Sequence, residues 1–213
     1  MFVISKSFEF AAAHSVHSQR LNREWAGSDY PKCRRLPGHG HNYKLTVYLT
    51  GELSQSQMVT DFGHLKWLKE FIDDCFDHKL IIGVDDPAFE LLFSKLELLD
   101  GKELKFPFET RITIVDENFR LKSFFGRSLT LGEISTCNFV TFGSSPLQSD
   151  PILDFYQRLV DGIGLFKGSP TSENLARFFY YFVKENVKPL GVVDCYKVSI
   201  NETPNSCASY SER

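Results

Sequence analysis

Hydrophobic and polar residues alternate in several segments of the chain, which is the period of a half-buried β-strand. Residues 2–10 and 42–50 show this alternation in the first quarter of the sequence, and residues 196–202 show it near the end. A short fourth strand is expected from Cys207 onward. On the third strand, the parity expected to face the core consists of Tyr196, Val198, Ile200 and Glu202.

Two other segments carry apolar residues at spacings of three and four, which predicts amphipathic helices. Asp61 can cap the first helix, which we expect to end near Asp77. Ser169-Pro170-Thr171 precedes the second helix, and Glu173 lies in its first turn, where the helix dipole favours an acid. The apolar stripe of the first helix is expected to be Phe62, Leu65, Leu68, Phe71, Ile72 and Cys75. That of the second is expected to be Leu175, Phe178, Phe179, Phe182 and Val183.

The stretch between the helices, about residues 82–167, is organised differently. Residues 110–115 and 119–125 flank a polar turn and predict a β-hairpin, and residues 137–142 predict another strand. The segments around them are rich in Gly, Pro and Ser and indicate loops. We therefore expect an α+β fold in a single domain of residues 1–213, with a mostly β and loop insertion at about 82–167.

Charge and composition exclude several classes of protein. The 213 residues include 24 Lys plus Arg against 27 Asp plus Glu, so the net charge of -3 gives no basic field for nucleic acid or for a membrane surface. No apolar run approaches the roughly 20 residues of a membrane span, and no secretory signal pattern is present. The five cysteines are scattered without CxxC pairs, which argues against a disulfide framework. We expect a cytoplasmic protein.

Three histidines are spaced for binding one metal ion. His39 and His41 open the second strand, so their side chains point the same way, about 6.6 Å apart along the backbone. His14 ends the first strand, and antiparallel pairing could bring it opposite them. Three neutral imidazoles suit a zinc ion that keeps one position for water or substrate. The same spacing also fits histidines that are merely exposed or hydrogen-bonded. Two histidines to which we assign no ligand role are His17 and His64.

Three further candidates lie outside this histidine group. Cys33 belongs to the long polar loop of residues 15–38, and Asp77-His78 follows the first helix. A thiolate serves as a base when an imidazole lowers its pKa and a carboxylate orients that imidazole. Taken singly, these residues also fit an incidental thiol and a helix end. Glu202 on an apolar face needs a cation or an amidine-like ring edge as partner, unless the strand has ended there and the carboxylate is solvated.

Together these segments resemble the family of 6-pyruvoyltetrahydropterin and 6-carboxytetrahydropterin synthases. Each segment is weak, but the ordered set is specific. The matching segments, in the family's order, are Phe8–His14, Cys33 six residues before His39, Gly38–Tyr43, Met58–Phe62, Asp77–Lys79, Pro170–Asn174 and Glu202-Thr203.

The resemblance implies the tunnelling fold, an antiparallel four-stranded sheet with two helices on one face in the order ββααββ. It also implies homo-oligomeric barrels with active sites at subunit interfaces. It assigns the zinc ion to His14, His39 and His41. The remaining roles that it implies are a catalytic base at Cys33, its relay at Asp77 and His78 in a neighbouring subunit, and pterin contacts at Glu202, Thr171 and Glu173.

The substrate implied by the resemblance is 7,8-dihydroneopterin triphosphate, with no external redox cofactor. The family forms either 6-pyruvoyltetrahydropterin, or 6-carboxytetrahydropterin for queuosine synthesis with loss of acetaldehyde. The Cys33 to His39 spacing and the GHGHNY string look more like the former, but the sequence does not separate the two. Basic residues nominated for the triphosphate are Arg20, Arg23, Lys32, Arg34 and Arg35.

Two features depart from the family pattern, and two other functions stay open. Asp77-His78 is not followed by the usual Asn, and the large insertion comes next. The open alternatives are a zinc-dependent hydrolase or cyclohydrolase acting on another purine or pterin heterocycle, and a non-catalytic zinc-binding interaction protein. The first of these would leave Cys33 without a role.

Overall fold

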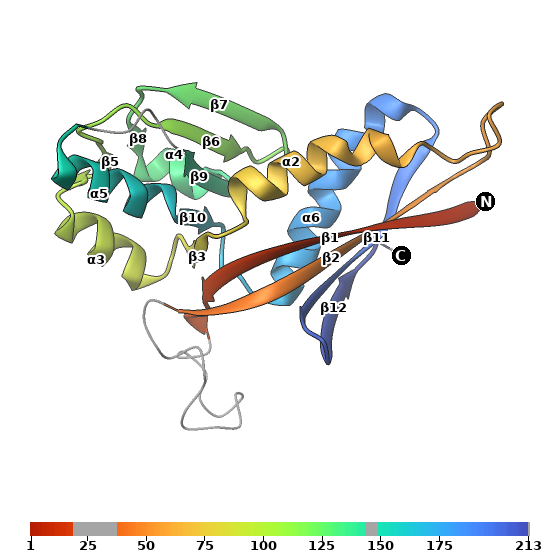
Figure 1. Ribbon diagram of the computed structural model, residues 1–213, viewed down its shortest axis with the longest axis horizontal. Coiled ribbons are helices and arrows are strands. Elements are labelled where there is room, and N and C mark those ends of the chain that lie inside the picture. Colours follow the sequence, from red (N-terminus) through yellow and green to blue (C-terminus); the bar gives the residue numbers. More distant parts are fainter. Residues whose placement is uncertain (19–37, 144–148, 213) are drawn as a thin grey trace.

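The computed structural model describes residues 1–18, 38–143 and 149–212, and a long twisted β-sheet runs through this part of the chain (Figure 1). Within the described residues this sheet has nine strands in the order β12-β11-β2-β1-β3-β10-β9-β6-β7. Its strands are β1 (Phe2–Ser15), β2 (His39–Gly51), β3 (Leu80–Gly83), β6 (Arg111–Val115), β7 (Leu121–Phe125), β9 (Phe139–Gly143), β10 (Ile163–Phe166), β11 (Val193–Thr203) and β12 (Ser206–Tyr210). A small second sheet contains β4 (Leu99–Asp100), β5 (Glu103–Leu104) and β8 (Leu129–Thr130).

Helices cover the sheet and connect its strands. The α-helices are α2 (Lys66–Cys75), α3 (Pro87–Lys95), α4 (Leu131–Thr136), α5 (Pro151–Asp161) and α6 (Ser172–Val187). The short 3-10 helices are η2 (Phe62–Leu65) and η3 (Lys188–Leu190). No helix in residues 1–18, 38–143 or 149–212 is long and apolar enough to cross a membrane.

The predicted four-stranded unit is present as β12-β11-β2-β1, and all three of its pairings are antiparallel. Side chains from β1, β2 and β11 share one apolar core with those of α2 and α6. Phe8, Phe10 and Tyr43 lie in this core, and the rings of Phe10 and Tyr43 stack with centroids 5.1 Å apart. The element order of this unit is the predicted ββααββ.

The prediction that the sheet ends at four antiparallel strands was wrong. β3 pairs in parallel with the end of β1, from Ala13 opposite Leu80 to Ser15 opposite Ile82. β10 then pairs in parallel with β3, and β9, β6 and β7 continue the sheet in antiparallel order. β3 and β10 are four residues long and almost wholly buried. They therefore lack the polar-apolar alternation that revealed the other strands.

The insertion is mostly β and loop, as predicted, but its described residues also contain three helices that were not predicted, α3, α4 and α5. Asp86 and Asp150 cap α3 and α5, and their side chains accept hydrogen bonds from the backbone N–H groups of Ala88 and Ile152 at 2.9 and 2.8 Å. In both helices a proline follows the aspartate directly. This Asp-Pro signal at a helix start was available in the sequence. The predicted hairpin and the strand after it were correct, as β6, β7 and β9.

Two residues of the predicted apolar faces point away from the core. Phe62 is 47% exposed because the first turn after Asp61 is a 3-10 helix, which rotates this residue off the stripe of α2. Tyr196 is also 47% exposed, since the pairing of β11 with β2 shifts register between Cys195 and Lys197. A β-bulge inserts a residue and moves it out of the alternation.

Candidate metal centre and active site

The pairing of β1 with β2 brings the three predicted histidines onto one face of the sheet. His14 lies opposite His39, and Ala12 lies opposite His41. This is the face that carries Phe8 and Phe10 toward α6, because residues two apart on a strand share a face. The two strands approach closely at this end, where a Cβ on Gly38 would lie 2.4 Å from the carbonyl oxygen of His14. Gly38 also has a φ of 140°, so a larger residue does not fit there.

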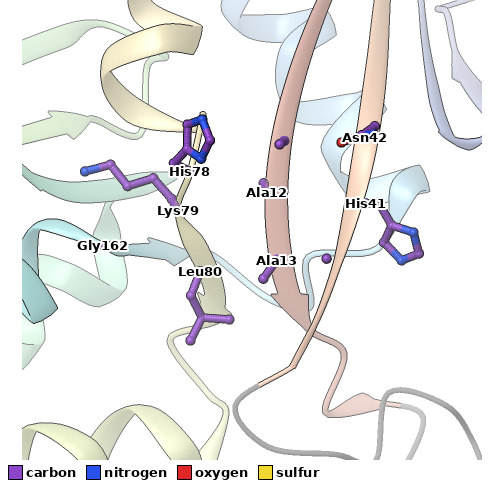
Figure 2. Close-up of a pocket in the computed structure, with 10 residues that line it drawn as sticks. Ala12, Ala13, His41, Asn42, His78, Lys79, Leu80 and Gly162 are labelled. Atoms are coloured by element: carbon purple, nitrogen blue, oxygen red, sulfur yellow. The ribbon is translucent and has the colours of Figure 1, made fainter.

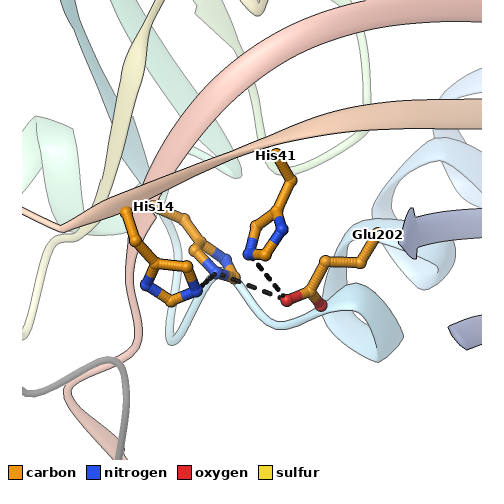
Figure 3. Close-up of side chains that lie close together, drawn as sticks. His14, His41 and Glu202 are labelled. Carbon is orange, nitrogen blue, oxygen red and sulfur yellow. Dashed lines mark hydrogen bonds and ion pairs between the residues drawn. The ribbon is translucent and has the colours of Figure 1, made fainter. Parts of the chain in front are cut away.

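Glu202, at the end of β11, joins the three imidazoles (Figure 3). The Nε2 atoms of His14 and His39 are 3.3 Å apart, and Oε1 of Glu202 lies 3.0 Å from Nε2 of His41 and 3.7 Å from Nε2 of His14. One ligand atom from each of the four residues falls within 4.8 Å of the others. A tetrahedral zinc ion with bonds of about 2.0–2.1 Å sets its ligands about 3.3–3.4 Å apart. The donor set therefore fits zinc in spacing and in chemistry.

The environment of His14 prepares this side chain to be a ligand. His14 is buried, and its Nδ1 donates a hydrogen bond to the carbonyl oxygen of Pro170 at 2.8 Å. This bond fixes the tautomer and leaves the lone pair of Nε2 directed at the site. Burial lowers the pKa of His14, which favours the neutral form that a metal requires.

His41 supplies a second observation that favours a metal ion. Its Nε2 atom is buried and makes no hydrogen bond, although Glu202 Oε1 lies 3.0 Å away. Buried polar atoms in folded proteins are almost always satisfied. A cation shared by His41 and Glu202 would satisfy both of them.

Ser172, the first residue of α6, is a site residue that the sequence analysis missed. Its hydroxyl donates to Oε2 of Glu202 at 2.5 Å, so the two oxygens of this carboxylate face different partners. Ser172 lies inside the Pro170–Asn174 segment that matches the family, and that position was the available signal. The sequence predicted a cation or an amidine-like ring edge as the partner of Glu202, and that stays a prediction; the contacts described here are with Ser172, His14 and His41.

Asp77 and His78 lie away from the imidazole group, just before β3 and next to β1 on the side opposite β2. Oδ1 of Asp77 accepts a hydrogen bond from the backbone N–H of Ala11 at 2.8 Å, and Oδ2 lies 3.7 Å from Nε2 of His78. The His78 side chain is 85% exposed, and its backbone adopts a left-handed φ of 58°. Figure 2 shows His78 and His41 on opposite sides of the β1–β2 pair. His78 and His41 both line an open cavity of about 500 Å³, across the backbone of β1 and β2 from each other.

Of the remaining predicted site residues, two lie at the start of α6 and the others lie outside the described residues. Thr171 is the N-cap of α6, and its hydroxyl accepts from the backbone N–H of Asn174 at 3.3 Å. Glu173 is exposed in the first turn of this helix. Cys33 lies outside the described residues. The same holds for the nominated triphosphate residues Arg20, Arg23, Lys32, Arg34 and Arg35.

The fold and the four-residue group define a candidate metal-dependent enzyme, and comparisons with known proteins identify its class. The sequence profile described as "6-pyruvoyl tetrahydropterin synthase" matches residues 3–213. The 6-carboxy-5,6,7,8-tetrahydropterin synthase of Aquifex aeolicus is 30% identical over 220 residues, which cover 98% of this chain and 97% of that protein. The 6-pyruvoyl tetrahydrobiopterin synthase of Homo sapiens is 34% identical over 96 residues, or 44% of this chain and 66% of its own.

Solved structures agree with this result. The uncharacterized protein WS1659 from Wolinella succinogenes superposes with a TM-score of 0.70 at 27% identity, and the match covers 100% of this chain and 98% of that one. The 6-pyruvoyl tetrahydropterin synthase of Caenorhabditis elegans gives a TM-score of 0.51 at 21% identity, covering 100% and 96%, and supports the fold. This chain belongs to the 6-pyruvoyl tetrahydropterin synthase family. It is accordingly a tetrahydropterin synthase, an enzyme of the lyase class.

Proposed function

We propose that this protein is a zinc-dependent carbon-oxygen lyase that converts 7,8-dihydroneopterin triphosphate to 6-carboxytetrahydropterin, with release of triphosphate and acetaldehyde. The convergence of His14, His39, His41 and Glu202 on one point carries the proposal. The choice of product is supported by the Aquifex aeolicus relative, which aligns with nearly the whole chain, the insertion included. This product would serve queuosine synthesis in the cytoplasm.

The chain's own residues divide the chemistry between them. His14, His39 and His41 would hold the zinc ion, which when bound supplies Lewis-acid polarisation of the substrate's side-chain oxygens. The carboxylate of Glu202 accepts hydrogen bonds from the amino and ring N–H groups of the pterin, a bidentate contact that fixes the ring. Thr171 and Glu173 contribute to the pterin pocket at the start of α6.

Cys33 is the proposed base, and it moves the proton of the substrate's side-chain carbon. His78 of a neighbouring subunit relays the proton for Cys33, and Asp77 orients the imidazole. The hydrogen bond from Ala11 to Asp77 supports this role, because it fixes the carboxylate beside His78. Departure of the triphosphate breaks a carbon–oxygen bond, and an internal redox shift reduces the pterin ring while it oxidises the side chain. Uptake of one water and cleavage of the side-chain carbon–carbon bond then give the 6-carboxylate and acetaldehyde, without an external redox cofactor.

We also propose that the active enzyme is a homo-oligomer with sites at subunit interfaces. The exposure of His78 and its place outside the imidazole group support this, since a neighbouring subunit could receive it. We regard residues 1–213 as one domain whose insertion, at about 82–167, extends the sheet. The rings of Phe76 and Phe139, one from each region, stack with centroids 4.5 Å apart and support this view.

Product analysis tests the proposed reaction. The zinc-loaded protein is incubated with 7,8-dihydroneopterin triphosphate, and the products are identified by mass spectrometry. We expect 6-carboxytetrahydropterin, acetaldehyde and triphosphate in equal amounts, and none of them from a His39→Ala variant. Formation of 6-pyruvoyltetrahydropterin would reassign the product within the family. Detection of neither pterin product and no released triphosphate would refute the proposed function.

A further inference from the structure

The carboxylate of Glu202 lies within ligand distance of the imidazole nitrogens of the candidate metal site. Its Oε1 atom is 3.0 Å from Nε2 of His41 and 3.7 Å from Nε2 of His14, close to the separation of about 3.3–3.4 Å expected between ligands of one tetrahedral zinc ion. We propose that Glu202 is the fourth metal ligand of the substrate-free enzyme and leaves the metal when the pterin binds. This inference rests on the proposed function, because the pterin is what displaces the carboxylate.

The contact between Glu202 and His41 is explained by a shared cation better than by a hydrogen bond. Nε2 of His41 is buried and has no hydrogen-bond partner, even with a carboxylate oxygen 3.0 Å away. When Nε2 carries the lone pair that a metal ligand needs, it and Oε1 are both acceptors, and they would repel each other at this distance unless a cation lay between them. A metal ion bound by both atoms provides that charge.

Ser172 orients the carboxylate of Glu202 so that only one of its oxygens faces the imidazoles. Its hydroxyl donates to Oε2 of Glu202, which leaves Oε1 directed at the imidazoles. Ser172 follows the N-cap of α6, so its position is fixed by a sixteen-residue helix whose buried face belongs to the main core. The hydroxyl thus selects which oxygen faces the metal.

Glu202 is also the ligand best able to move. The side chain of Glu202 is 26% exposed, whereas that of His14 is 3% exposed and is held by Pro170. The bidentate contact with a pterin uses both carboxylate oxygens, so it would compete with the metal for Oε1, while Oε2 can accept from Ser172 and the pterin together. Withdrawal of Oε1 on pterin binding would leave one metal position for the substrate's side-chain oxygens. Without substrate, the position stays closed to other ligands.

Metal binding in the absence of turnover tests this inference. Cobalt(II) replaces zinc in the full chain as a visible probe, and thiocyanate is titrated as a small anion that binds an open metal position. Glu202→Gln should bind thiocyanate at least about tenfold more tightly than the wild type. Its zinc affinity, measured against a chelating dye, should fall about 10–100-fold. In the wild type, 7,8-dihydroneopterin should alter the cobalt spectrum.

Two variants serve as references in this experiment. Glu9→Gln changes an exposed carboxylate on β1 and should match the wild type in zinc and thiocyanate affinity. Ser172→Ala keeps the carboxylate but frees Oε2, so its thiocyanate affinity should lie between those of the wild type and Glu202→Gln. Circular dichroism of each variant checks that it is folded.

Equal thiocyanate affinity in the wild type and in folded Glu202→Gln would overturn the inference and leave Glu202 with the pterin alone. This outcome is separate from failure of the proposed function, which would appear as the absence of pterin product and of released triphosphate. The metal measurements involve no turnover, so each claim can fail without the other.

Discussion

The two halves of the large sheet differ in how they are buried. In the antiparallel unit, β1 alternates between exposed and buried positions, so one face of this unit is packed against α2 and α6 and the other is open. In the insertion, β9 and β10 are buried at nearly every position. The imidazoles and Glu202 all belong to the first half. The candidate metal site thus lies in the antiparallel half, on the face that packs against α6, while the insertion extends the core beside it.

Removing a metal ligand should have the largest effect on function and should leave the stability of the metal-free protein nearly unchanged. His39→Ala should lower triphosphate release by more than about 10³-fold, because Lewis-acid assistance is worth several kcal/mol. The free energy of unfolding of the metal-free protein should change little, since His39 lies outside the apolar core. Zinc content and initial rates measure the first effect, and urea unfolding measures the second. A His39→Ala variant that keeps both zinc and activity would contradict the assignment of the metal site to the antiparallel half.

A substitution that creates a cavity in the insertion should lower stability and leave zinc binding unchanged. Leu165 on β10 is fully buried, and Leu165→Ala should lower the free energy of unfolding by about 2–5 kcal/mol, as measured by urea denaturation. Leu121 on the edge strand β7 is 47% exposed, so Leu121→Ala is the matched control and should change this free energy by less than about 0.5 kcal/mol. Equal effects of the two substitutions would mean that the insertion is not a packed core. The zinc affinity of folded Leu165→Ala should equal that of the wild type.

Withdrawal of zinc should destabilise the protein through the antiparallel half. At free zinc equal to about 100 times the dissociation constant, binding adds about 2.7 kcal/mol to the free energy of unfolding. Unfolding in zinc and in a chelator measures this difference. Leu165→Ala should retain the full difference, and His39→Ala should lose most of it. A difference that persists in His39→Ala would place the bound metal elsewhere.

The smallest effect is expected at a helix cap of the insertion. Asp150 caps α5, and Asp150→Ala should lower the free energy of unfolding by about 1 kcal/mol. Asp150→Asn keeps the acceptor oxygen and should recover most of this loss. Thermal unfolding of the two variants provides the measurement. The rate of triphosphate release at a temperature where all variants are folded should be unchanged.

The difference between the halves also explains what the sequence could predict. Half-buried strands show alternating apolar and polar residues, so β1, β2, β11 and β12 were predicted. The spacing of His39 and His41 then placed both side chains on the same face of β2. The short buried strands β3 and β10 have no such pattern, and their partners are distant in the chain. Tertiary pairing therefore determined the extent of the sheet.

Within the site, the sequence pattern predicted which residues take part but not which of them contact one another. Glu202 was singled out by its parity, yet its approach to His41 depends on where β11 ends against β2. The signal for Ser172 was its place in the Pro170–Asn174 segment, which did not indicate a contact with Glu202. The assignments of Cys33, Asp77 and His78 to proton transfer stay predictions that rest on the family resemblance.

Titration of metal-free protein with zinc, with triphosphate release from 7,8-dihydroneopterin triphosphate as the readout, tests whether the reaction depends on one zinc ion per chain. We expect no release without metal and a linear rise in rate that stops at one zinc per chain. Release that is already complete in the metal-free protein, or full zinc binding without any release, would contradict it.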